Sequence, residues 1–335
     1  MLLGVVLFGL RGRPLASLVQ PGAAGPAARL VEADFPRLRL PPGAGNDGQA
    51  FYAIARDPLH PRTTARYLDR PRYRLQRPGY PLLAWAAHPW GGGNGLVLAL
   101  LGVNLGAAVL AAAALGWFAV RRGRSPAYGL LALALPGAYV AVRISCADLL
   151  AGGLALLAAA LFLDGRTRQA AALAAVAALT KESTLLLTLA VAAASWRSDR
   201  RGAVMFAAPA VVVTGALWAV LLVMFPHAGR QYGEIGAPLR GLADSARYWR
   251  DTHDWKPAFT VLGTLALAVA AMRRRSPLAL ATAAYLALFC VQAMGTLAFW
   301  TSAPRTLYPL GLCAVAALLE RPRVEALIAP LPIRV

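Results

Sequence analysis

Long apolar runs dominate the sequence from residue 94 onward and restrict the folds open to the chain. A helix needs about 20 apolar residues to cross the hydrocarbon core of a bilayer, and several runs meet or approach that length. Only 15% of the residues are charged, against about 25% in soluble domains. We therefore predict an all-α, polytopic transmembrane protein with about nine or ten membrane helices, some of them short or broken. The runs cover approximately residues 94–120, 126–142, 145–163, 169–180, 184–196, 202–225, 258–272, 276–300 and 306–320.

The connectors between these runs differ in charge, and the difference orients the chain. The positive-inside rule places basic connectors in the cytoplasm. The other connectors then face outward, including a long first extracytoplasmic loop with short interfacial helices (11–93) and a second one (226–257). The basic connectors are RRGRS (121–125), DGRTR (164–168), RSDRR (197–201), RRR (273–275) and RPR (321–323).

The two ends of the chain complete this topology. The apolar stretch MLLGVVLFGL (1–10) is half a span, although alternation requires a crossing there. We interpret it as a partial first helix that is truncated at its start. Transmembrane helices then occupy 94–320 and a cytoplasmic tail 321–335. The prediction is one membrane domain over 1–335, multi-pass in the cell membrane, with both termini cytoplasmic.

The net charge of +19 would ordinarily suggest a nucleic-acid partner. Here the arginines lie between apolar runs and in the first loop, which favours membrane lipids as partners and argues against nucleic acid. The three cysteines lie in apolar runs without ligand spacing, and the four histidines form no metal motif. We assign no metal ligands and no cofactor, and the sequence leaves the use of a divalent metal open.

Six charged residues from distant parts of the chain approach the outward side of this topology. Ionisable residues in or beside the membrane are functional candidates. Structural alternatives stay open for each of them: a turn residue in Asn-Asp-Gly, the polar turn of a helical hairpin, a self-satisfying ion pair or a headgroup anchor. The six are Asp47, Arg143, Asp148, Lys181, Glu182 and Arg305.

An outward-facing site with an acid and several cations suits a substrate that carries a lipid phosphate. Arginine forks bind phosphate bidentately, and a carboxylate near an acceptor hydroxyl can act as a general base. Together these groups favour glycosyl transfer, with Asp47 as the base. Arg74 and Arg77 could reach the phosphate, and Gln49 and Tyr52 could bind sugar hydroxyls.

Three blocks of sequence resemble bacterial membrane proteins of the GT-C glycosyltransferase superfamily. They are NDGQAFYAIARDP (46–58) with YRLQRPGYPLLAW (73–85), the segment 146–186 that ends in TKESTLL, and RTLYPLG (305–311). The resemblance implies many transmembrane helices, an extracytoplasmic active site and a polyprenyl-phosphate lipid donor. It also implies that the acid of the first outer loop, here Asp47, is the catalytic base. A paired-acid motif beside Asp47 is not evident, although EAD (32–34) has the form Glu-x-Asp.

Two other classes of function remain open on the sequence. One is a transporter or flippase for a lipid-linked or anionic solute, which should show internal repeats and charges near mid-membrane. The other is a non-catalytic membrane protein of the same fold. The enzyme hypothesis predicts that Asp47, Lys181, Glu182 and Arg305 line one outward cavity. If the base lies elsewhere, Asp34 is the next candidate.

Overall fold

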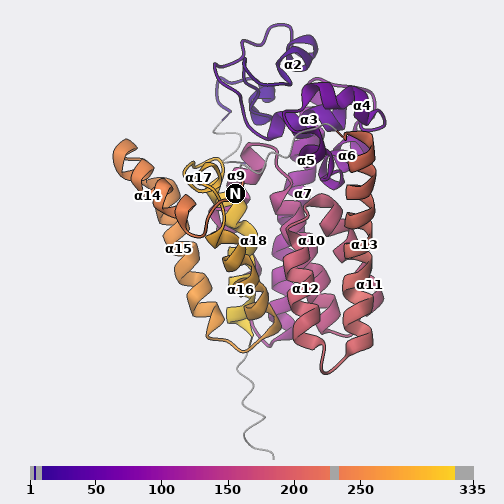
Figure 1. Ribbon diagram of the computed structural model, residues 1–335, viewed down its shortest axis with the longest axis vertical. Coiled ribbons are helices and arrows are strands. Elements are labelled where there is room, and N and C mark those ends of the chain that lie inside the picture. Colours follow the sequence, from indigo (N-terminus) through magenta and orange to yellow (C-terminus); the bar gives the residue numbers. More distant parts are fainter. Residues whose placement is uncertain (1–3, 5–9, 227–233, 321–335) are drawn as a thin grey trace, which may run out of the picture.

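Helices provide the regular structure in the computed structural model, which describes residues 4, 10–226 and 234–320. No β-strand occurs among these residues. Most of the partial helix expected at 1–10, and the whole tail 321–335, lie outside the described residues. Short helices form the first 90 residues and gather at one end of the molecule, called here the loop end (Figure 1). They are η1 (Leu15–Leu18), α2 (Ala28–Asp34), α3 (Gly48–Arg56), α4 (Pro61–Thr64), η2 (Ala65–Tyr67), α5 (Pro71–Leu75) and α6 (Gly79–Ala87).

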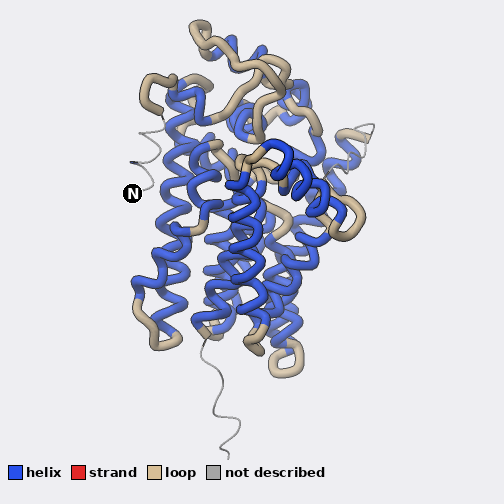
Figure 2. Tube along the Cα trace, turned by 90° about the vertical axis from the view of Figure 1, so that its left-hand side faces the viewer, coloured by secondary structure: helices blue, strands red, loops and turns tan. Residues whose placement is uncertain are grey.

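The remaining helices form a bundle that runs from the loop end to the opposite end (Figures 1 and 2). Most of its connections lie at these two ends. The helices are α7 (Asn94–Arg121), η3 (Pro126–Leu130), α8 (Leu131–Ala134), α9 (Pro136–Arg143), α10 (Asp148–Leu163), α11 (Thr167–Thr180), α12 (Thr184–Ser195), α13 (Arg200–Met224), α14 (Arg240–Thr252), α15 (Trp255–Met272), α16 (Pro277–Cys290), α17 (Met294–Leu297) and α18 (Ala303–Leu319).

Three of the described helices, α7, α13 and α15, are long and apolar enough to cross a membrane. Four more, α10, α12, α16 and α18, are apolar but shorter than 18 residues. The outer faces of the long helices carry exposed apolar side chains, including Val109, Val212, Val223 and Phe259. Exposed apolar surface of this extent marks an interaction site or contact with lipid. The long apolar helices therefore indicate a membrane-associated protein.

Two of the predicted runs do not form single helices. The run 126–142 breaks before Pro136, because the preceding residue, Leu135, is extended (ψ 126°), as the residue before a proline usually is. The run 276–300 divides into α16 and α17. Between them, the backbone near Gln292 pairs with Ile235 instead of continuing the helix.

Helix α10 lies at the centre of the bundle and is buried on nearly all sides. It packs against α7, α11 and α18, which explains its composition of alanine, leucine and glycine. A Cβ atom on Gly152 would lie 2.9 Å from the ring of Tyr308, and one on Gly153 would lie 3.2 Å from the backbone of Ala111. Small residues at these contacts let the helix axes approach closely. This packing fixes Asp148, at the start of α10, under the loop end.

Candidate functional site

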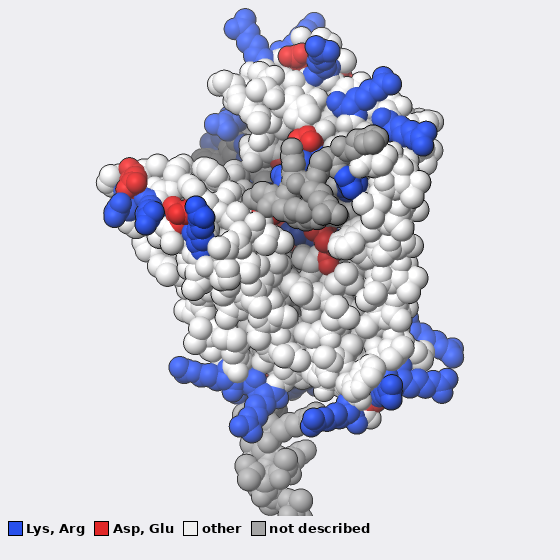
Figure 3. Space-filling view, viewed as in Figure 1, with Lys and Arg blue, Asp and Glu red and all other residues white. Residues whose placement is uncertain are grey.

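A cavity of about 750 Å³ opens at the loop end, between the short helices and the tops of α16 and α18. Figure 3 shows acidic and basic side chains side by side at this end of the molecule. One side of the cavity is charged and the other is largely apolar. The charged lining consists of Asp47, Asp69, Arg70, Arg77, Lys181, Glu182, Glu234 and Arg305.

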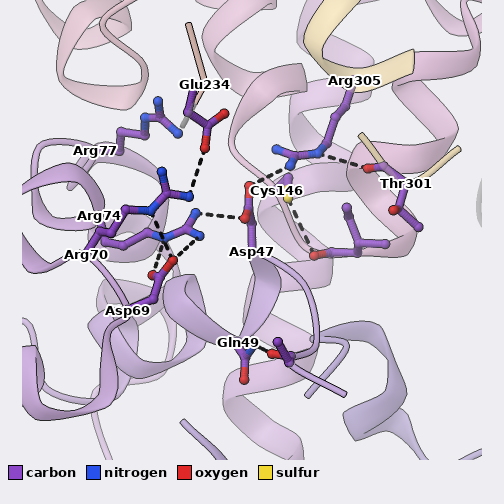
Figure 4. A network of polar contacts seen from close by, with 12 residues as sticks. Asp47, Gln49, Asp69, Arg70, Arg74, Arg77, Cys146, Glu234, Thr301 and Arg305 are labelled. Carbon is purple, nitrogen blue, oxygen red and sulfur yellow. Dashed lines mark hydrogen bonds and ion pairs between the residues drawn. The ribbon is translucent and has the colours of Figure 1, made fainter. Parts of the chain in front are cut away.

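Asp47 lies between two arginines that are distant in sequence. Arg74 of α5 places Nη1 2.8 Å from Asp47 Oδ1. Arg305, in the first turns of α18, places Nη2 2.6 Å from Asp47 Oδ2. Both carboxylate oxygens are therefore engaged, as Figure 4 shows. The contact between the first loop and the last helix is thus made through the predicted base.

A second acid, Asp148, joins two more of the predicted residues. Lys181 Nζ pairs with Asp148 Oδ1, and Arg305 Nη1 lies 3.6 Å from Oδ2. Asp148 is in the first turn of α10, where the helix dipole favours a carboxylate. Lys181 lies at the break between α11 and α12. Arg305 therefore bridges Asp47 and Asp148.

Two forked ion pairs hold Arg74 and Arg77 of the first loop. Arg74 donates from Nε and Nη2 to the carboxylate of Asp69, at 2.8 and 3.0 Å. Arg77 donates from Nε to Glu182 Oε2 at 2.8 Å and pairs through Nη2 with Oε1. The ring of Tyr73 lies beside both, with its centroid 4.2 Å from the guanidinium carbon of Arg77 and 5.3 Å from that of Arg74. This aromatic ring helps to hold the cations in place.

Glu234 and Ile235, which precede α14, line one side of the cavity. Arg70 Nη2 lies 2.9 Å from Glu234 Oε1, so an ion pair connects the two outer loops. Glu234 is held in turn by its backbone, because its carbonyl accepts a hydrogen bond from the amide of Ala293. The chain between α16 and α17 is therefore part of the site, which explains why it leaves the helical path.

Two glycines allow the first loop to approach the bundle closely. A Cβ atom on Gly48 would lie 2.2 Å from the carbonyl oxygen of Ile144, in the turn between α9 and α10. A Cβ atom on Gly79 would lie 2.4 Å from Oγ1 of Thr180, next to Lys181. Any larger residue at either position would push the loop outward. These contacts place Asp47 and Arg77 within reach of the bundle residues.

The charges of the site control the protonation of its loop carboxylates. Burial alone would raise the pKa of Asp47, but the positive charges of Arg305, Arg74 and Arg77 outweigh burial and hold that pKa well below its ordinary value. Burial likewise opposes a low pKa at Asp69, and the hydrogen bond and charge of Arg74 lower it. Both groups are ionised at neutral pH. Asp47 is a weak proton acceptor as long as both arginines hold it.

The structure brings seven of the predicted residues together: Asp47, Arg74, Arg77, Asp148, Lys181, Glu182 and Arg305. Their roles in binding or catalysis stay predictions.

Three predicted residues lie apart from this cluster and do not line the cavity. Gln49 donates to the carbonyl of Ala44 at 2.5 Å. The hydroxyl of Tyr52 donates to Asp34 at 2.6 Å, and Tyr52 is fully buried. Arg143 donates to the carbonyl of Ser17 at 3.1 Å. Asp34, the alternative base, is engaged by Tyr52 and is likewise absent from the lining.

Sequence reasoning missed Asp69, Arg70 and Glu234. Asp69 is the one acid in the basic stretch 61–79, and Glu234 is the one glutamate of the second outer loop. An isolated acid among arginines is a signal that could have identified Asp69. Nothing local indicates that Glu234 meets Arg70, because that contact depends on how the two loops fold together.

Neither a family model, nor a curated protein, nor a solved structure matches this chain. The resemblance to the GT-C superfamily therefore stays a prediction. Within the described residues, no three His, Cys, Asp or Glu side chains form a group that could hold a metal ion. The chemistry of the site is that of its ion pairs: a buried carboxylate for proton transfer, and guanidinium and ammonium groups for an anion.

Proposed function

We propose that this protein is an integral membrane glycosyltransferase that moves a sugar from a polyprenyl-phosphate-linked donor to an extracytoplasmic acceptor. Asp47 is the general base. Arg77, Lys181 and Arg305 line the cavity and contact the donor phosphate, and Asp148 and Glu182 hold these cations in position. Arg74 orients Asp47. The chain crosses the membrane several times, with both termini in the cytoplasm and the cavity on the outer side.

The distribution of charge supports the membrane embedding. On the face shown in Figure 3, charged side chains gather at the two ends and leave an uncharged band between them. The exposed apolar faces of α7, α13 and α15 belong to this band. Such a band suits the hydrocarbon core, because charges are costly there. The basic connectors 121–125, 164–168, 197–201 and 273–275 lie at the end opposite the cavity.

The shape of the cavity supports a lipid phosphate as substrate. Its charged side faces an apolar wall that continues down α16 and α18. A prenyl chain can pack on this wall while its phosphate lies among the arginines. A water-soluble sugar phosphate has no apolar chain and would leave the wall without a contact. The wall is formed by Tyr285, Leu288, Phe289, Leu307 and Leu310.

The ion pairs of the site also suggest how an anionic donor prepares the base. Every cation of the cluster is paired with an acid, so a phosphate must compete for these cations. A phosphate that draws Arg305 toward itself leaves one oxygen of Asp47 without its partner. The pKa of Asp47 then rises toward its ordinary value, and the carboxylate becomes a better proton acceptor. Donor binding and activation of the base are coupled in this way.

The transfer itself exchanges one bond for another. The acceptor oxygen forms a bond to the anomeric carbon of the donor sugar, and the bond from that carbon to the phosphate oxygen breaks. The acceptor proton passes to Asp47. The leaving polyprenyl phosphate gains one negative charge, which Arg305, Arg77 and Lys181 stabilise.

The observation that carries the proposal is the pairing of Asp47 with both Arg74 and Arg305 beside an apolar wall. The test is sugar transfer from labelled polyprenyl-phosphate sugars in membranes that contain wild-type protein, Asp47→Asn or Asp57→Asn at equal expression. Asp57 is a matched control, because it ends the same helix, pairs with His60 and does not line the cavity.

We expect transfer by the wild type and by Asp57→Asn, and a loss of at least about 100-fold in Asp47→Asn. Transfer retained in Asp47→Asn would refute its role as base. No transfer from any donor, in an assay where a known polyprenyl-phosphate-dependent transferase works, would refute the enzyme. Movement of intact donor across the membrane would then favour the transporter.

A further inference from the structure

A cavity with a volume of about 1640 Å³ lies at the end opposite the proposed active site. The last turn of α7, the turn after α12 and the connection between α15 and α16 meet around it. All three bring arginines to its lining. These are Arg121, Arg122, Arg197, Arg273, Arg274 and Arg275.

Only part of this positive charge is balanced by the described acids. Arg121 and Arg122 share Asp164, at 2.7 and 3.4 Å. The ion pairs of the described residues include none to Arg197 or to the run 273–275, although Asp199 and Glu320 also line the cavity. Because several helices end here, some of these arginines complement helix dipoles. Three consecutive arginines on the α15–α16 connection are more positive charge than the dipole of one helix end requires.

The same cavity also has apolar walls. Phe162, Leu163 and Leu280 line it beside the arginines, and Leu280 is 44% exposed. A free phosphate or a nucleotide would gain little from these side chains. A phospholipid matches both parts, because its phosphate meets the guanidinium groups while an acyl chain covers the leucines.

We infer that this cavity binds an anionic phospholipid of the leaflet that surrounds the basic end. The inference rests on the proposed membrane embedding but not on the proposed glycosyl transfer. In the proposed topology the leaflet is the cytoplasmic one, whose anionic lipids attract arginine clusters. The bound lipid bridges α7, α12 and the α15–α16 connection, and so joins the two sides of the bundle.

A neighbouring cavity at the same end provides a matched control. It has a volume of about 540 Å³ and is lined by Arg166, Arg168 and Arg201, but its one large apolar lining residue is Met205. General attraction between lipid and a basic surface would depend equally on both sets of three arginines. A defined lipid site depends on the set beside the apolar walls.

The test is native mass spectrometry of the full-length protein, purified in detergent with dioleoylphosphatidylglycerol or dioleoylphosphatidylcholine added. We expect the wild type to retain the anionic lipid preferentially. Retention should fall at least about fivefold in the variant R273Q/R274Q/R275Q and stay near wild type in R166Q/R168Q/R201Q. Equal losses in the two variants, or no preference for the anionic lipid, would overturn the inference.

Two further measurements separate a lipid site from a simple phosphate site and from misfolding. Leu280→Ser keeps every arginine and changes an exposed side chain, so the fold should tolerate it. It should lower retention of the anionic lipid, and wild-type retention would refute the acyl contact. An excess of glycerol phosphate should not displace the lipid, because it lacks an acyl chain. Displacement by glycerol phosphate would show that the phosphate alone is recognised.

Discussion

Arg305 connects two acids that belong to different parts of the fold: Asp47 of the first loop and Asp148 at the start of the central helix α10. Its Nη2 lies 2.6 Å from Asp47, and its Nη1 lies 3.6 Å from Asp148. A single guanidinium therefore fixes the loop against the bundle and presents a positive charge to the cavity. A lysine could carry the same charge but not both contacts.

Replacing Arg305 by glutamine should lower the rate of sugar transfer at saturating donor by about 100-fold, because it removes a cation from the leaving phosphate. Arg305→Lys should fall between this variant and the wild type. Initial rates measured with labelled donor give both values. A rate for Arg305→Gln close to wild type would remove Arg305 from the proposed mechanism.

Gly48→Ala should displace Asp47 without changing any charge. The new methyl group would lie 2.2 Å from the carbonyl oxygen of Ile144, and such overpacking costs about 1–3 kcal/mol of the free energy of unfolding. Thermal unfolding in detergent should show a lower midpoint, and transfer per folded molecule should fall. The control is Gly102→Ala in α7, where a Cβ meets no atom within 4 Å. Equal midpoints for the two variants would refute the close contact.

The fold was predictable where the sequence is uniform and less so where distant segments meet. The bounds of helices α7 (Asn94–Arg121) and α13 (Arg200–Met224) agree within a few residues with the runs 94–120 and 202–225. In a long apolar run, a helix is the structure that lets the backbone make all its hydrogen bonds within the segment. The break before Pro136 was not predicted, although it has a local cause, because the residue before a proline is usually extended. The break near Gln292 was not predicted either, because it depends on pairing with Ile235.

The candidate site shows the same division. Charged side chains in an otherwise apolar chain usually pair with opposite charges. Their clustering was therefore predictable from composition and topology. The direction of individual side chains was not. Tyr52 was expected to bind sugar hydroxyls, but Tyr52 and Arg56 both contact Asp34. None of these three residues lines the cavity that holds Asp47, because α2 brings Asp34 to Tyr52 and Arg56.

Tyr52→Phe tests whether Tyr52 binds sugar or supports the fold. Its hydroxyl donates to Asp34 at 2.6 Å and accepts from the amide of Gly93 at 2.7 Å. Losing both hydrogen bonds should cost about 2 kcal/mol of the free energy of unfolding. Transfer per folded molecule and the KM for the donor should stay at wild-type values. Wild-type stability with reduced transfer would instead place Tyr52 in contact with substrate.

The low pKa of Asp47 predicts where stability and activity depend on pH. A carboxyl whose pKa is lowered in the folded state stabilises the fold above its unfolded pKa, about 3.9, and loses that contribution as pH falls through the folded pKa. The stability difference between wild type and Asp47→Asn should therefore be constant above about pH 5 and shrink below about pH 4. Unfolding midpoints across this range measure it. An acidic limb of kcat/KM near pH 6 that vanished in Asp47→Asn would contradict the low pKa of Asp47.

The pair of Arg77 and Glu182 should behave as a coupled unit, because both side chains are largely buried and joined by two contacts. Glu182→Gln leaves a buried guanidinium without its counter-charge, and breaking such a pair costs about 3–5 kcal/mol. The double variant Arg77→Gln, Glu182→Gln leaves no buried charge of either sign at this contact and should be more stable than the sum of the two single changes predicts. Unfolding free energies of the four proteins complete the cycle. Additive effects would show that the two residues act separately, and that Arg77 is held in the cavity by other contacts, chiefly with the ring of Tyr73.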